Sequence, residues 1–250
     1  SQSQPQRQAF MWRQLAAVLL AGFCPQGPVP LDLDDTLFHK SGRQVQGAAW
    51  WRDAVRSTTT RVVHGLGLNL VVLTLRVSPP WGGQPLGLPI NVRLHRKHDL
   101  TTLDLAEQMV RELAAWFSER CWRLAADGAY ASLAKRGLPR CELTSRMRRD
   151  AALYDPPPKT RKRPRGRPRK KGRRLPTPEA MAKTVSAWKR LTLNLRGKRV
   201  QRLTYTRQVL WYAVCPDRAV LLVICRDPKG KEPDDFFFTT DLSASAAQVI

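Results

Sequence analysis

Alternating apolar and polar residues predict strands in the first 150 residues of the chain. Residues 31–36 read LDLDDT, and a period of two places Asp32 and Asp34 on one face of a strand, away from the two leucines. Residues 61–77 are rich in Val, Leu and Thr, which predicts one long strand or two shorter ones. Further short apolar runs predict strands at 88–94, 122–126 and 141–145.

Helical patterns separate these strands. Apolar residues recur with helical spacing over 103–117, and Thr101 or Thr102 can cap that helix. Two further helices are expected, at 10–23 and at 129–135, and the polar residues before the first are expected to be frayed. The resulting order β-β-β-α-β-α-β predicts an α/β fold with a mixed sheet.

The last third of the chain predicts mainly strands. One short helix is expected at 178–188, followed by strands at 191–195, 200–206, 209–214, 219–225 and 236–240. Ser245 to Gln248 form a capping box, which predicts a further helix, yet the chain ends two residues later at Ile250. Because a helix needs more than one turn to be stable, we expect the C-terminus to be cut off there.

Charge is the outlying property of the composition. The 250 residues contain 43 Lys and Arg against 20 Asp and Glu, which gives a net charge of +23. Such an excess argues against an ordinary enzyme of small neutral metabolites and favours a polyanionic partner, nucleic acid before an anionic membrane surface. The longest early apolar run, residues 15–23, is too short for a membrane span. The five cysteines are scattered without a CxxC pair, which argues against zinc and fits a reducing compartment.

Much of this charge lies in one proline-rich segment, residues 155–178. Within 159–174, eleven of sixteen residues are Lys or Arg and none is acidic, so we expect disorder in isolation. Its sequence RPRGRPRKK resembles an AT-hook, in which Gly166 lets the backbone enter an A·T-rich minor groove and the flanking arginines reach its floor. A tether that contacts only phosphates, or that has no DNA role, is the alternative. The DNA-binding residues expected here are Arg163, Arg165, Gly166, Arg167, Arg169, Lys170 and Lys171.

Carboxylates end two of the predicted strands. Asp34 and Asp35 end the first, and Asp127 ends the fourth. A pair of Mg²⁺ ions needs several carboxylate oxygens close together, and neighbouring strand ends can supply them from distant positions. The alternative is local, since Asp-Gly and Asp-Asp-Thr are also common in turns and caps.

Three sequence blocks, in order, resemble the DDE transposases of bacterial insertion sequences. The first is LDLDDTLFHKSGRQVQGAAWWRD, with Asp34-Asp35-Thr36 and Lys40-Ser41-Gly42; the second is LAADGAYAS, with Asp127-Gly128 and Tyr130; the third is FFFTTDLSASAAQVI. The resemblance runs over most of residues 29–250. It implies an RNase H-like core, a mixed sheet flanked by helices.

The resemblance also implies a chemistry. It implies DNA cleavage followed by strand transfer of the freed 3′-hydroxyl, with two Mg²⁺ (or Mn²⁺) ions as cofactors. Asp34 and Asp127 would be the catalytic and metal-binding carboxylates, with Asp35 as the alternate for the first. The expected partner is double-stranded DNA, at the element ends and the target, and no membrane. A homodimer and a place in the bacterial cytoplasm at the nucleoid are compatible with this.

One departure from the family pattern bears on activity. The third acid of such enzymes is a Glu on the helix after the last strand, and here the chain stops before any such block. The late acids precede that helix and fit the position poorly; they are Glu232, Asp234, Asp235 and Asp241. We therefore expect no third catalytic acid in this chain. A non-catalytic DNA-binding remnant and an RNase H-like nuclease that cuts without joining are the alternatives.

These patterns predict five segments. They are an N-terminal helical segment 1–28, an RNase H-like core 29–150 with the first two blocks, a basic linker 151–178, a mainly-β insertion 179–233, and 234–250 with the last strand and the start of a truncated catalytic helix.

Aromatic residues and histidines add two weaker expectations. Trp50-Trp51, expected in a loop with Arg52 and Arg56 nearby, is the best candidate for stacking on bases, although core packing explains most of the eight tryptophans. The run His95-Arg96-Lys97-His98 is most simply a basic surface patch, because the histidines lack the spacing of a ligand set.

Overall fold

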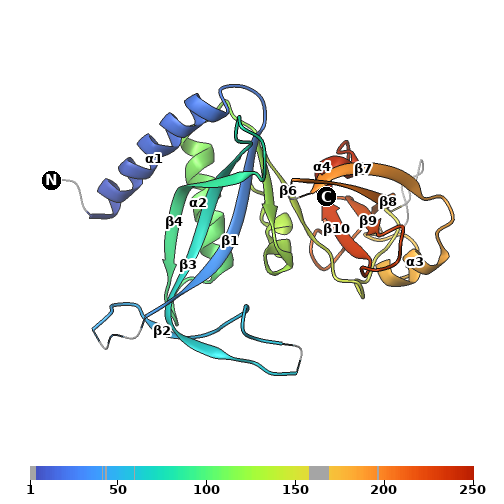
Figure 1. Cartoon of the computed structure of the whole chain (residues 1–250), viewed down its shortest axis with the longest axis horizontal. Coiled ribbons are helices and arrows are strands. Elements are labelled where there is room, and N and C mark those ends of the chain that lie inside the picture. Colours follow the sequence, from blue (N-terminus) through green and yellow to red (C-terminus); the bar gives the residue numbers. More distant parts are fainter. Residues whose placement is uncertain (1–3, 41, 43, 59, 158–168, 196) are drawn as a thin grey trace. The chain divides into compact units, whose positions relative to one another are not determined.

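The computed structural model divides the chain into two compact units (Figure 1). The first unit consists of residues 1–77 and 86–122, and the second of residues 78–85 and 123–250. The structure describes residues 4–40, 42, 44–58, 60–157, 169–195 and 197–250. In that part of the chain, none of the helices combines the length and apolarity of a membrane span.

One long strand organises the first unit. β3 (His64–Val77) pairs antiparallel with β1 (Val29–His39), with β2 (Ala49–Arg52) and with β4 (Leu86–His95). The apolar stretch 61–77 therefore forms a single strand rather than two. A β-bulge in the β3–β4 pair shifts the register after Leu73.

The two faces of this sheet differ. Val71, Leu73 and Leu75 of β3 are fully buried, because alternate residues of a strand share a face. α2 (Thr102–Trp116), which packs against β3 and β4, buries the other side of that core. The Thr101 hydroxyl accepts the Asp104 N–H and the Asp104 carboxylate accepts the Thr101 N–H, so the cap expected at the start of α2 is confirmed.

α1 begins further upstream than its sequence predicted. It spans Gln4–Phe23 and contacts β3 and β4, so the polar residues before position 10 are partly helical. Ala16 and Leu20 are its buried residues.

The second unit is built on six neighbouring strands in the order β5-β6-β10-β9-β8-β7. Their bounds are β5 (Trp122–Ala126), β6 (Cys141–Arg146), β7 (Lys189–Leu195), β8 (Lys198–Val209), β9 (Val220–Arg226) and β10 (Asp235–Thr239). The central strand β9 is buried almost throughout. The rings of Trp211 and Phe238 meet edge to face at 5.2 Å in the core of this unit.

Three short helices complete the second unit. They are the 3₁₀ helix η1 (Gly128–Arg136), α3 (Pro178–Thr184) and α4 (Ala246–Val249). The helix expected after position 128 is therefore a 3₁₀ helix, and α3 ends four residues earlier than predicted. The Trp188 indole N–H donates to the Val185 carbonyl, 2.9 Å, as the chain leaves α3 extended toward β7.

Two predictions of strands were wrong. Residues 200–206 and 209–214 do not form separate strands, because β8 continues to Val209, which pairs with Val220 of β9. The chain then turns, with the Cys215 N–H donating to the Trp211 carbonyl at 2.8 Å.

The loop expected around Trp50 and Trp51 is a strand instead. These residues lie in β2, a four-residue strand that pairs with the edge of β3.

Gly67 gives a test of the β1–β3 approach. A Cβ at this position would overlap the backbone carbonyl of Phe38 in β1, so we expect Gly67→Ala to destabilise the protein by about 1–3 kcal/mol. Gly22→Ala, with open space around the added Cβ in α1, is the control and should be neutral or stabilising. Urea unfolding midpoints compare the two. Equal midpoints for both variants would contradict this close approach.

Candidate functional site

Asp34 lies on the open face of β1. Leu31 and Leu33 are buried, whereas Asp34 is exposed and lies opposite Val72 of β3. The face expected from the LDLDDT alternation is therefore confirmed. The Asp34 Oδ1 accepts the N–H of Asp35 at 2.9 Å, a local bond that orients the carboxylate.

Asp32, two residues earlier on the same face, is held by an arginine. Arg76 of β3 donates from Nε to Asp32 Oδ2 at 2.9 Å and also bonds Oδ1. This hydrogen bonding raises the pKa of Arg76. Because the bidentate pair occupies both oxygens of Asp32, a cation would have to displace Arg76 to use them. No pattern in the sequence marks Arg76 as this partner.

Asp35 points to the other face of β1, opposite Val71. Its charge acts on His95 of β4, where burial lowers the pKa of His95 against the raising effect of Asp35 and Asp99. His95 is not simply part of a basic surface patch. Its ring stacks on Trp51 at 4.6 Å, and its Nδ1 lies 3.2 Å from the Asn69 side-chain nitrogen.

Asp127 caps η1 in the second unit. Its Oδ1 accepts the Ala129 N–H at 2.9 Å, and its carbonyl accepts the Ser145 hydroxyl of β6 at 2.7 Å. The local alternative, a capping aspartate after β5, is thus realised in the structure. This capping bond uses only the Oδ1 atom of the carboxylate.

Asp34, Asp35 and Asp127 are donors of the right chemistry for a divalent cation, but only Asp127 follows the end of a strand. β1 continues to His39, so the prediction that Asp34 and Asp35 end their strand was wrong. Asp34 and Asp35 adjoin each other in the first unit, and Asp127 belongs to the second; that Asp34 and Asp127 share a metal pair stays a prediction. Among the described residues, no three His, Cys, Asp or Glu side chains gather into a metal-binding group. Mg²⁺ often takes only one or two carboxylates and completes its shell with water and substrate phosphate, so exposed aspartates fit it.

The late acids are engaged in ion pairs with arginines of the second unit. The pairs are Glu232–Arg202, Asp234–Arg226, Asp235–Arg146 and Asp241–Arg123. Arg226 also lies over the Trp188 ring at 4.4 Å. Each of these carboxylates is thus paired with an arginine, and that none of them serves as a third catalytic acid stays a prediction.

The basic segment is only partly described. Arg163, Arg165, Gly166 and Arg167 lie outside the described residues. Arg169 and Lys170 are exposed.

Lys171 has a different environment. Its ammonium lies 4.6 Å from the Tyr154 ring and 4.5 Å from the Tyr212 ring, an arrangement that competes with any contact to DNA. The sequence carries no signal for this pairing, since both tyrosines are distant along the chain.

The chain on the two sides of the basic segment is joined by backbone hydrogen bonds. The Asp155 N–H donates to the Arg173 carbonyl and the Gly172 N–H to the Asp155 carbonyl, both at 2.9 Å. Tyr154 also pairs with Leu210 at the end of β8. Gly172 is required here, because a Cβ would lie 2.7 Å from two backbone oxygens. The basic segment therefore leaves and rejoins the second unit at one place.

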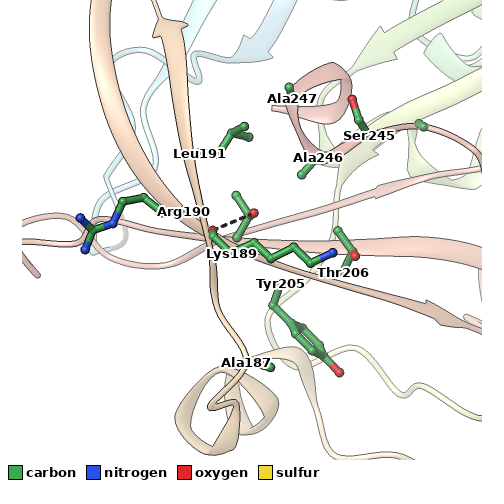
Figure 2. A pocket seen from close by; sticks show the side chains of 11 residues that line it. Ala187, Lys189, Arg190, Leu191, Tyr205, Thr206, Ser245, Ala246 and Ala247 are labelled. Atoms are coloured by element: carbon green, nitrogen blue, oxygen red, sulfur yellow. Dashed lines mark hydrogen bonds between the residues drawn. The ribbon is translucent and has the colours of Figure 1, made fainter.

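A pocket of about 540 Å³ lies elsewhere in the second unit (Figure 2). Lys189 extends along it toward Thr206, and the residues around Ser245 before α4 close another side. The Thr204 hydroxyl donates to the Lys189 carbonyl at 3.2 Å, the dashed contact in the figure. None of the carboxylates predicted to bind metal lines this pocket.

A family model described as DDE superfamily endonuclease matches residues 1–212, a range that contains Asp34, Asp127 and the basic segment. A search of curated proteins finds no match. The family agrees with the fold, and the prediction of an α/β, RNase H-like class with a mixed sheet flanked by helices is confirmed. Because the match covers most of its length, this chain belongs to the DDE superfamily of endonucleases.

Proposed function

We propose that this chain is the catalytic part of a transposase of a bacterial insertion sequence. Members of its superfamily act on DNA and generally use divalent metal ions. The observation that carries the proposal is the exposed Asp34 on a strand whose Leu31 and Leu33 are buried, inside the family match. The proposed reaction is cleavage of a DNA strand at the element end and transfer of the freed 3′-hydroxyl to target DNA.

Each carboxylate has a proposed role. Asp34 and Asp127 would hold the two Mg²⁺ or Mn²⁺ ions, with Asp35 as the alternate for Asp34. When bound, the metal supplies a lowered pKa for the attacking hydroxyl and charge stabilisation for the leaving oxygen. The protein's own part is to fix the oxygens in place. β1 does so through its pairing with β3, and the Ala129 N–H does so for Asp127.

The proposed contacts to DNA are made by the excess of Lys and Arg side chains. Excess cations give non-specific affinity for duplex DNA through counterion release. The basic segment begins and ends at the hydrogen-bonded junction of Asp155 and Arg173, and it would insert an AT-hook into the minor groove. We further propose that 29–150 is the catalytic core, that the 179–233 insertion carries DNA, and that the protein acts at the bacterial nucleoid, with a homodimer as its assembly.

One alternative has an observation in its favour. The capping bond of Asp127 is what a structural aspartate makes, and it suits a DNA-binding protein without catalysis. An RNase H-like nuclease that does not join strands would share the same metal carboxylates. Metal dependence separates the first alternative from the proposal, and product analysis separates the second.

Asp127 allows a clean test of the metal role. We expect Asp127→Asn to keep the cap of η1, because Asn caps as well as Asp does, but to lose the metal charge. Substitution of a residue that only supports a metal ligand typically lowers activity by about 10- to 100-fold. Because Asp127 would itself be a ligand, we expect Mg²⁺-dependent nicking of plasmid DNA to fall by more than that. Asp127→Ala should lose about 1 kcal/mol of stability in addition.

Asp34→Asn should abolish nicking in the same assay, with Asp150→Asn as the control. Asp150 is exposed and pairs locally with Arg148, so its loss should leave nicking unchanged. Nicking by Asp34→Asn at the wild-type rate would contradict the assigned role. A wild-type chain that neither nicks DNA nor binds Mg²⁺ by calorimetry would favour the non-catalytic alternative.

The AT-hook is tested by changing geometry while charge stays constant. Replacing Arg165 and Arg167 by Lys removes the planar guanidinium groups. We expect A·T-rich duplex to be bound about 1–3 kcal/mol more weakly if the arginines contact base edges, and G·C-rich duplex to change little. Both duplexes are titrated at one salt concentration. Equal effects on the two would leave the segment as a phosphate-binding tether.

A further inference from the structure

Two aromatic side chains lie exposed on one face of the first unit's sheet. Phe38 of β1 is 54% exposed and lies opposite Leu68 of β3. Trp50 of β2 is 59% exposed and lies opposite Leu66. Directly opposed residues of an antiparallel pair project to the same side, and Leu66 and Leu68 are two apart. Phe38 and Trp50 therefore stand on the same face, with β3 between them.

This is also the face of Asp34. Along β1, Asp34, Thr36 and Phe38 alternate with residues of the other face, and all three are exposed. Four residues of extended strand, about 13 Å, separate Asp34 from Phe38. The proposed metal ligand and the two rings thus lie on the same exposed face of β1, β2 and β3.

Contacts on the opposite face of the sheet fix the position of the strand that carries Trp50. Trp51 projects to the opposite face, where its ring stacks on His95 and lies 5.6 Å from the Lys97 ammonium. Asp53, only 3% exposed, then holds the turn after β2.

The Asp53 contacts are specific. Its Oδ1 accepts the N–H groups of Val55 and Arg56, each at 3.0 Å, and its Oδ2 lies 3.1 Å from His39 Nε2. A ring on a fixed strand loses little conformational freedom when a ligand stacks on it.

The surroundings of these rings are cationic. Residues 40–63 contain five Lys and Arg and one acid, Asp53, which is buried in its ion pairs with His39 and Arg56. Arg52 is exposed on the same face as Trp50, opposite His64. A protein partner that covered this face would need acidic groups for these cations, whereas a nucleic acid strand supplies both flat bases and phosphates.

We propose that this aromatic platform, Phe38 and Trp50 with Arg52, binds an unpaired DNA strand by stacking two bases on the rings. The bases of an intact duplex are covered by their neighbours, so an exposed ring can stack only on a base that has left the helix. Sheet faces with exposed aromatic residues bind single strands in this way. The inference rests on the proposed function, because it places the strand to be cut beside Asp34.

The test is single-strand binding without catalysis. Anisotropy of labelled oligo(dT) and of a duplex of equal length is measured in EDTA at one salt concentration. We expect Trp50→Ala to weaken oligo(dT) binding by about 5- to 100-fold and to change duplex binding much less, while Trp50→Phe retains most of the affinity. Phe38→Ala should act in the same direction. Trp81→Ala is the matched control, since Trp81 is 80% exposed and lies in the β3–β4 turn, outside the strands that carry the platform.

Three outcomes would overturn the platform. Trp50→Ala could behave like Trp81→Ala, it could weaken duplex and single-strand binding equally, or it could change the sedimentation of the protein without changing oligo(dT) binding, which would make the face an interface between copies. The EDTA in the binding test keeps the platform distinct from the catalytic proposal. Oligo(dT) binding is measured there without metal chemistry, so failure of nicking and failure of the platform are separate results.

Discussion

The pairing of β3 with three neighbours is the constraint on which the first unit depends. Its register sets every face, because side chains alternate along a strand and a shift of one residue would exchange them. In such a shift, Leu31 and Leu33 would reach the open face and Asp34 would be driven under α2. The buried valines and leucines of β3 oppose this shift, and Gly67 permits the close approach to β1 that the register needs. Apolar packing on one face therefore places the polar chemistry of the other.

Ion pairing follows from the large excess of cations. In a chain of +23 net charge, an aspartate that lies near another chain segment readily meets an arginine. Arg76 takes Asp32, and arginines of the second unit take the acids between 232 and 241. Pairs of this kind at the surface add little stability. Their consequence is chemical, since an aspartate bound by an arginine is a poor ligand for a cation.

The described residues on the two sides of the basic segment are bonded to each other. Backbone bonds join Asp155 to Arg173 and Gly172, and the Lys171 ammonium lies between two tyrosine rings. These bonds fix where the described chain stops before residue 158 and resumes after residue 168. Under the proposed function, DNA that binds the basic segment is tethered to the second unit by both ends of that segment.

By itself, the sequence determined the elements whose signals are local. The LDLDDT alternation predicted the buried and exposed faces of β1, the apolar stripe and Thr101 predicted α2, and β5 was predicted at its observed bounds. The family could be predicted as well, because its three blocks are short and in order.

Only the tertiary structure decided which distant residues meet. β2 is a strand because β3 lies beside it, β8 extends to Val209 because β9 pairs with it, and Arg76 and Tyr212 acquire their partners through strand register and loop closure. A local pattern shows the period of an element. A four-residue strand, an ion pair or a ring contact is stabilised by a partner far along the chain. The local sequence does not identify that partner.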